Sequence, residues 1–134
     1  MNKNKCDICK APIHPLAKLC KRCKKIVDRV DTRKKPNKLA RIGALKRAWD
    51  GEAFRCYYTD IMLNENNHKD PRYLTFDHRI PRQEDDLVVA SGCINDMKSD
   101  MTEQEFRVMV IALSNIFQGG QFDSRAFELK HWKR

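Results

Sequence analysis

The stretch DHRIPRQEDDLVVASGCINDMK, residues 77–98, decides how the surrounding chain folds. Residues 73–78 alternate between polar and apolar side chains, which predicts a half-buried strand that Pro81 ends. The short apolar run at residues 87–90 predicts a second strand, and residues 92–98 predict a helix. This order of strand, loop, strand and helix indicates an α+β fold.

Four side chains in this stretch have complementary chemistry. Asp77 and His78 are adjacent at the end of the first predicted strand, and Asn95 and Lys98 share one face of the predicted helix. An imidazole can accept a proton from water near neutral pH. Carboxylate and amide oxygens are suitable ligands for a hard cation such as Mg²⁺ or Mn²⁺. Together with a lysine that can contact phosphate, these groups predict hydrolysis of a phosphodiester.

This arrangement resembles the HNH nucleases, whose site is a two-stranded ribbon and a helix around one metal ion. The resemblance covers roughly residues 51–106, and its core is Asp77-His78-x-Ile80-Pro81 followed, seventeen residues after the histidine, by Asn95-x-x-Lys98. The longer run from residue 44 to residue 100 is also similar to small HNH proteins of phages and mobile elements. The resemblance implies a ββα-metal motif with flanking helices.

The resemblance also implies a role for each site residue. His78 would be the general base, Asp77 and Asn95 the ligands of one catalytic divalent ion, Mg²⁺ or Mn²⁺, and Lys98 a helper. The products would carry 5′-phosphate and 3′-hydroxyl ends. A bacterial or phage-infected cytoplasm is the expected location.

Two features depart from the family pattern. Where many relatives have an asparagine before the second strand, this chain has Asp85-Asp86, whose carboxylates could accept the same loop hydrogen bonds. Many relatives also carry two further cysteine pairs, of which only Cys56 and Cys93 remain here. Two thiols cannot complete a four-ligand site, so we expect both to be buried as small apolar groups.

Four other cysteines predict a metal-binding module at the start of the chain. Cys6-x2-Cys9 and Cys20-x2-Cys23 have the spacing of two knuckles that close a tetrahedral zinc site. A four-thiolate shell leaves no position for water, so the expected Zn²⁺ is structural. A redox role for one pair is the alternative, and His14 between the knuckles could replace one ligand.

Charge is unevenly distributed along the 134 residues, which carry a formal net charge of +9. Residues 1–50 contain 16 Lys and Arg against 4 Asp and Glu, whereas residues 51–134 contain 11 against 14. The basic first part predicts a polyanionic partner that is bound without sequence preference. Together with the nuclease resemblance, the expected partner is double-stranded DNA. The longest apolar run, residues 108–113, is too short to span a bilayer, so we expect no membrane partner.

These patterns divide the chain into four parts. Residues 1–32 are predicted to form the zinc ribbon and a basic helix, and residues 33–50 a basic hinge and a second helix. Residues 51–118 form the predicted nuclease domain, with an additional strand at residues 54–59. Residues 119–134 are predicted to form a last helix that packs on the body.

Basic side chains on the helices and beside the site are the expected contacts to nucleic acid. The alternative for the helix at residues 37–49 is that its apolar stripe packs on the body while its charges are merely solvated. The expected nucleic-acid-binding residues are Lys21, Arg22, Lys24, Lys25, Arg41, Lys46, Arg47, Arg79 and Arg82.

A helix with an apolar stripe follows the site. Thr102-x-x-Glu105 predicts a capping box, and Gly119-Gly120 predicts the end of the helix. We expect its stripe to be core, although dimerisation through it is an open alternative, so the chain is predicted to be a monomer or a homodimer. The stripe consists of Phe106, Met109, Val110, Leu113, Ile116 and Phe117.

Two functions are compatible with the sequence. In the first, the chain is a metal-dependent HNH endodeoxyribonuclease, in which the basic parts hold DNA while His78 and its neighbours cut it. In the second, it is a non-catalytic, zinc-containing nucleic-acid-binding protein with a degenerate HNH body.

Overall fold

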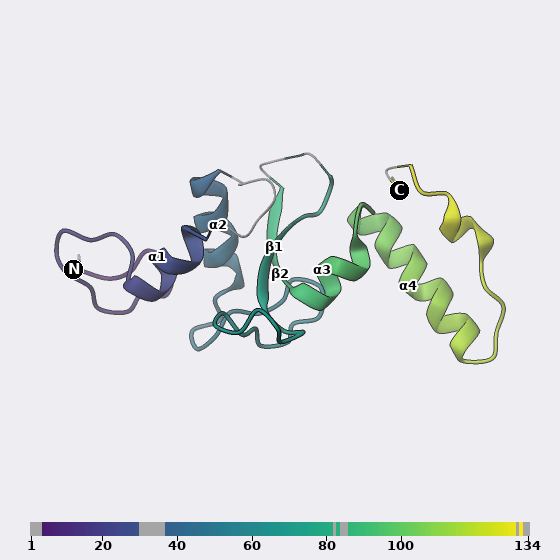
Figure 1. Cartoon of the computed structure of the whole chain (residues 1–134), viewed down its shortest axis with the longest axis horizontal. Helices are drawn as coiled ribbons and strands as arrows, with labels where there is room; N and C mark the ends of the chain where they lie inside the picture. Colours follow the sequence, from purple (N-terminus) through teal and green to yellow (C-terminus); the bar gives the residue numbers. More distant parts are fainter. Residues whose placement is uncertain (1–3, 30–36, 82, 84–85, 131, 133–134) are drawn as a thin grey trace.

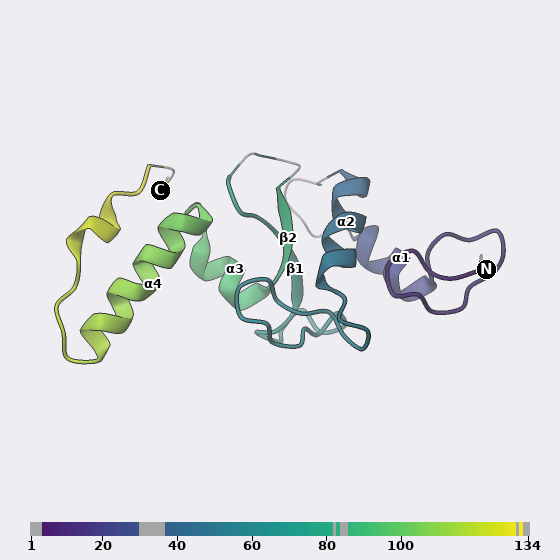
Figure 2. The same cartoon turned by 180° about the vertical axis from the view of Figure 1, so that it is seen from behind.

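The computed structural model describes residues 4–29, 37–81, 83, 86–130 and 132. These form an elongated α+β molecule with the N-terminal module at one end, a two-stranded ribbon at the centre and a helical hairpin at the other end (Figures 1 and 2). The helices are α1 (Lys21–Val27), α2 (Lys38–Ala48), α3 (Gly92–Lys98) and α4 (Glu103–Phe117), the strands are β1 (Leu74–His78) and β2 (Leu87–Ser91), and η1 (Ser124–Phe127) is a 3₁₀ turn. The α+β prediction is confirmed.

The ribbon is antiparallel, with Asp77 opposite Val88 and His78 opposite Leu87. Because side chains alternate along a strand, one face, the apolar face, carries Leu74 and Phe76 with Leu87 and Val89, and the other carries Thr75 and Asp77 with Val88 and Ala90. The apolar face packs against α2 and forms the core, which contains Leu74, Phe76, Leu87, Val89, Leu45 and Phe54. Helix α3 contacts both strands, so strand, loop, strand and helix follow one another as the sequence predicts.

Arg41 anchors α2 to the preceding helix. Its side chain is only 1% exposed, and Nη1 donates hydrogen bonds to the backbone carbonyls of Val27 and Arg29. The guanidinium also lies over the ring of Phe76, 5.4 Å from its centroid. The prediction that Arg41 contacts nucleic acid does not fit this burial, since the side chain lies between α1, α2 and the ribbon.

The segment expected to be a strand, residues 54–59, is a turn. Phe54 and Arg55 make only isolated bridges, to Trp49 and Met62. The chain then reverses direction. The Asp60 amide donates a hydrogen bond to the Cys56 carbonyl, and Asp60 adopts the left-handed backbone conformation with φ 62°. The aromatic content of the segment reflects packing of its side chains rather than a strand ladder.

This turn repeats the backbone pattern of the first cysteine knuckle. There, the Lys10 amide donates to the Cys6 carbonyl, and Lys10 has φ 65°. In both turns the first cysteine is buried, and the Cys56 sulfur accepts a hydrogen bond from the Ser91 amide. Burial of Cys56 agrees with the prediction, whereas Cys93 is exposed and the prediction that it is buried is wrong.

Helix α4 begins at the predicted capping box and ends next to Gly119, which has φ 88°. The prediction that its stripe is core is wrong for most of its length. Phe106 is buried, but Val110, Leu113 and Phe117 are exposed, because α4 projects away from the ribbon (Figures 1 and 2). None of the described helices has the length and apolar character needed to cross a membrane.

The last described residues lie along α4 rather than on the body. They contain one 3₁₀ turn in place of the expected helix, and this turn packs on α4. Phe122 and Phe127 stack at 5.0 Å, and the Lys130 amide donates to the Glu105 carboxylate. The C-terminal segment and α4 therefore form a hairpin of their own.

Arg41→Ala is expected to lower the free energy of unfolding by about 2–4 kcal/mol, because two buried carbonyls lose their donor and a cavity remains. Urea denaturation at constant metal loading measures this loss. Lys38→Ala, at an exposed position of the same helix, should change the stability by less than about 0.5 kcal/mol. Equal stabilities of the two variants would contradict a structural role for Arg41.

Candidate functional site

The four N-terminal cysteines form a cluster that can bind one metal ion. Their sulfur atoms all lie within 4.8 Å of one another, and Cys9 and Cys20 are 3.7 Å apart. Sulfurs bound tetrahedrally at about 2.3 Å from a metal are about 3.8 Å apart, so the observed separation fits a four-thiolate shell. Cys6 and Cys23 are fully buried. His14 is exposed and is not part of this cluster.

The environment of the cluster favours thiolate at one position. Burial raises the pKa of Cys6, but hydrogen bonds from the backbone at Cys20, Cys9 and Ile8 outweigh it and lower this pKa to about 6. Burial raises the pKa of Cys23 instead. A metal ion would therefore displace protons as it binds, which makes its affinity depend on pH.

Asp77 lies at the centre of a second polar group, between β1, α3 and the turn at residues 56–61. Tyr58 donates its hydroxyl to Oδ2 at 2.5 Å, and the Lys98 ammonium lies 3.4 Å from both carboxylate oxygens. The Asp77 side chain is 7% exposed. Burial raises its pKa, while the Tyr58 hydrogen bond and the Lys98 charge act in the opposite direction.

Lys98 is a buried lysine, with its side chain only 1% exposed. Besides Asp77, it binds the backbone carbonyl of His78 at 2.8 Å. The ammonium thus connects the last turn of α3 to Asp77 and His78 at the end of β1. This burial does not fit the expectation that Lys98 contacts phosphate.

Asn95 lies one helical turn before Lys98 and contacts the same strand. Its Nδ2 donates to the Thr75 hydroxyl at 3.1 Å and to the Phe76 carbonyl at 3.2 Å. Both bonds use the amide nitrogen, so they fix the carboxamide and leave Oδ1 as an acceptor. Within the described part of the chain Oδ1 accepts no hydrogen bond, and it is not among the buried unpaired atoms. Thr75 and Asp77 share one face of β1, which places Asn95 and Asp77 on the same side of the ribbon.

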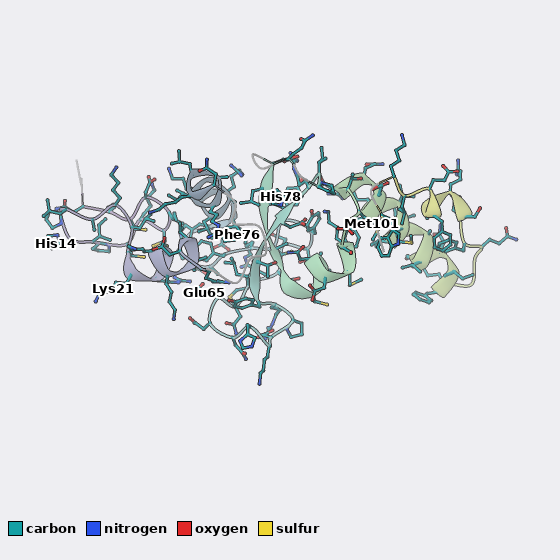
Figure 3. The ribbon with its side chains drawn as sticks, turned by 45° about the horizontal axis from the view of Figure 1, so that its top comes forward. His14, Lys21, Glu65, Phe76, His78 and Met101 are labelled. Atoms are coloured by element: carbon teal, nitrogen blue, oxygen red, sulfur yellow. The ribbon has the colours of Figure 1, made fainter. Side chains whose placement is uncertain are left out.

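His78 is the last residue of β1 and is half-buried. Figure 3 shows it near the end of the ribbon, beyond Phe76. Its ring nitrogens have no hydrogen-bond partner among the residues that the structure describes. The imidazole is therefore held by its backbone beside Asp77 while its nitrogens remain available to a substrate or to water.

A hollow of about 500 Å³ lies between α2, β2 and the turn at residues 56–61. Three arginines line it, and two of them have acidic partners. Arg79 binds Asp86, and Arg55 binds Asp50. Arg47 donates to the Leu87 carbonyl and has no carboxylate partner within the described residues. It is therefore the arginine of this hollow with the most freedom to bind an added anion.

The loop between the strands is held by Arg79 and Asp86. The Arg79 amide donates to the Asp86 carbonyl, and the two side chains form an ion pair. Among the described residues, the Asp86 carboxylate accepts from the Arg79 guanidinium and not, as expected from the sequence, from backbone amides of the loop. Arg82 and Asp85 lie outside the described residues.

The remaining basic residues of the predicted nucleic-acid surface fall into two groups. Lys21 and Lys25 are exposed and have no acidic partner in the described part of the chain. The others are paired: Arg22 with Glu65, Lys24 with Asp28 and Lys46 with Asp7.

Tyr58 is a site residue that sequence reasoning did not identify. In the sequence it is one of several aromatic residues in a segment that resembles a strand, and nothing links it to Asp77, nineteen positions later. The edge-on contact of its ring with Phe106 also connects the site to α4.

Comparisons with protein-family models, curated proteins and solved structures found no match to this chain. Functional inference therefore depends on the residues and their geometry.

Replacing Lys98 by methionine should remove the countercharge of Asp77 and lower the free energy of unfolding by about 3–5 kcal/mol. A carboxyl group whose pKa is higher in the folded than in the unfolded protein contributes less stability as pH rises through that folded pKa. Burial raises the pKa of Asp77, and loss of Lys98 raises it further. The deficit should therefore be larger at pH 8 than near pH 4, as measured by urea unfolding without added divalent ions.

Lys69→Met replaces an exposed lysine and serves as the control for this variant. It should leave stability within about 0.5 kcal/mol of the starting protein at both pH values. A Lys98→Met deficit that is small, or that grows as the pH falls, would contradict the burial of an ion pair.

Purified protein is expected to contain about one tightly bound metal ion per chain at the cysteine cluster. The double change Cys6→Ser and Cys20→Ser should abolish this binding, since two of four thiolates are lost, whereas Cys93→Ser should retain it. Elemental analysis by mass spectrometry measures the metal content. Metal-free protein from cells grown in metal-replete medium would refute the site.

Proposed function

We propose that this chain is a metal-dependent endonuclease of the HNH type, which hydrolyses phosphodiester bonds in DNA. The observation that carries the proposal is that Asp77 and Asn95 lie on one face of the ribbon, at the end of β1 that His78 completes. Asp77 and Asn95 lie on its α3 side, and His78 follows directly with unpartnered ring nitrogens.

The donor atoms fit a hard divalent ion, Mg²⁺ or Mn²⁺. Asn95 offers Oδ1, and the Asp77 carboxylate retains lone pairs beyond those used by Tyr58 and Lys98. Two protein oxygens leave room for water and phosphate, as is usual for Mg²⁺. When bound there, the ion would offset the negative charge that develops on phosphate oxygens during hydrolysis.

His78 supplies the base of the proposed reaction. A ring nitrogen accepts a proton from a water molecule as the water attacks phosphorus. The bond from phosphorus to the 3′ oxygen breaks, and this oxygen takes a proton from solvent to become the 3′-hydroxyl. Lys98 and Tyr58 position this chemistry without contacting the substrate. Lys98 holds the His78 carbonyl and the Asp77 carboxylate together, and the Tyr58 hydroxyl donates a hydrogen bond to Oδ2 of Asp77.

The metal of the cysteine cluster is proposed to be Zn²⁺ with a structural role. Four thiolates in a tetrahedral arrangement favour zinc and leave no open coordination position for a substrate. The cluster lies at the start of α1, where the Cys20 sulfur accepts a hydrogen bond from the backbone amide of Cys23. The ion would thus hold α1 and its exposed lysines at a fixed orientation.

DNA is the proposed substrate because basic side chains lie beside the ribbon and the first part of the chain is strongly basic. Arg47 and Arg79 line the hollow beside β2, and Lys21 and Lys25 are exposed on α1. Such contacts bind the phosphate backbone without reading bases. We therefore expect binding that is sensitive to salt and tolerant of sequence.

A non-catalytic nucleic-acid-binding protein is the second candidate function. The specific observation in its favour is that Asp77 is already neutralised by Lys98 and held by Tyr58. This network would stabilise the ribbon even if no divalent ion ever bound. The two functions differ in a single outcome, which is whether DNA is cut.

Relaxation and linearisation of a supercoiled plasmid test the proposal. Cleavage should require added Mg²⁺ or Mn²⁺, and His78→Ala should reduce its rate by at least about 100-fold because the base is lost. The ends should carry 5′-phosphate and 3′-hydroxyl groups, which ligation without prior phosphorylation detects.

His68→Ala is the matched control, since His68 is exposed and lies outside the site. It should cut at the original rate. Full activity of His78→Ala would overturn the assignment of the base. A plasmid that shifts in a gel but stays intact under all metal conditions would favour the second function.

A further inference from the structure

We propose that two copies of this chain associate through one face of α4. The face consists of Val110, Leu113, Ile116 and Phe117, referred to below as the apolar α4 face. Their side chains are 40%, 36%, 42% and 83% exposed, respectively. Spacings of three and four residues place them along one side of the helix.

The chain itself does not cover this face within its described residues. The 3₁₀ turn η1 packs on α4, and Ala112 and Ala126 are buried in the hairpin. Ala112 is about 100° or more around the helix from Leu113, Phe117 and Val110 but only about 40° from Ile116, so the buried side borders the apolar α4 face at Ile116 and leaves its other members uncovered. Only the first part of the stripe, Phe106, is covered by the body, where it meets Tyr58.

The exposed area is appropriate for a stable protein–protein contact. From their exposed fractions, the four side chains present on the order of 400 Å² of apolar surface, which is within the range of the largest, often functional, patch on a soluble monomer. A standard interface uses about 800 Å² per partner, of which slightly more than half is apolar. The apolar α4 face therefore supplies most of the apolar part of one such surface.

The lack of charge allows this face to meet the same face of a second copy. Residues 108–122 contain no charged side chain, although 34% of the chain is charged. Two such faces can meet around a twofold axis without bringing like charges together. The basic N-terminal module lies at the opposite end of the molecule (Figures 1 and 2), so the two modules would remain far apart.

Sedimentation velocity of the full-length, metal-loaded protein tests this inference. At micromolar concentrations the chain should sediment as a closed dimer, and Phe117→Glu should convert it to a monomer with unchanged helix content by circular dichroism. Val110→Lys, at a second position of the same face, should have the same effect.

Ile111→Glu provides the matched control, because Ile111 is 61% exposed on the opposite side of the same helix. It should leave the dimer intact. A monomeric wild-type chain at about 100 μM, association that continues to larger species, or equal effects of Ile111→Glu and Phe117→Glu would each overturn the proposal. None of these outcomes depends on nuclease activity.

Discussion

The buried carboxylate of Asp77 is the constraint on which the centre of this molecule depends. An ionised group at this depth costs several kcal/mol unless partners compensate it, and here the partners come from two other segments. Lys98 reaches it from α3, and Tyr58 reaches it from the turn at residues 56–61. By satisfying Asp77, these contacts fix α3 and the turn relative to β1. The orientations of Asn95 and His78 follow from that arrangement.

Sequence patterns within a single segment predicted those parts of the fold that depend on neighbouring residues alone. Alternation identified β1, the cysteine spacing identified a four-cysteine cluster that could hold a metal ion, and Thr102 with Glu105 identified the start of α4. Periodicity shows which side chains share a face, but not what covers that face. For this reason the α4 stripe was expected in the core, and buried Arg41 was expected to contact nucleic acid. The role of Tyr58 depends on the turn formed by Asp60, which has a left-handed backbone conformation, and on Asp77, which is distant in sequence. No local sequence pattern indicates either feature.

In the proposed function, the molecule has three functional regions along its length. The basic cysteine module would hold the phosphate backbone, the ribbon with α3 would carry the reaction, and α4 would join two copies. Because the contact with Phe106 connects Tyr58 to α4, the proposed dimer helix and the site share one packed junction. A dimer would present two basic modules to one nucleic acid and bind it more tightly than a single chain through its higher effective concentration.

Binding of Mn²⁺, followed by electron paramagnetic resonance on zinc-loaded protein, tests most directly whether the ribbon holds a divalent ion. We expect the wild-type chain to bind one Mn²⁺ that excess Mg²⁺ displaces, and His78→Ala to retain it because the imidazole is not a ligand. Asn95→Ala should weaken this binding at least tenfold, since it removes one of two protein oxygens. No bound Mn²⁺ in the wild-type chain, or equal affinity in Asn95→Ala, would contradict the proposed site.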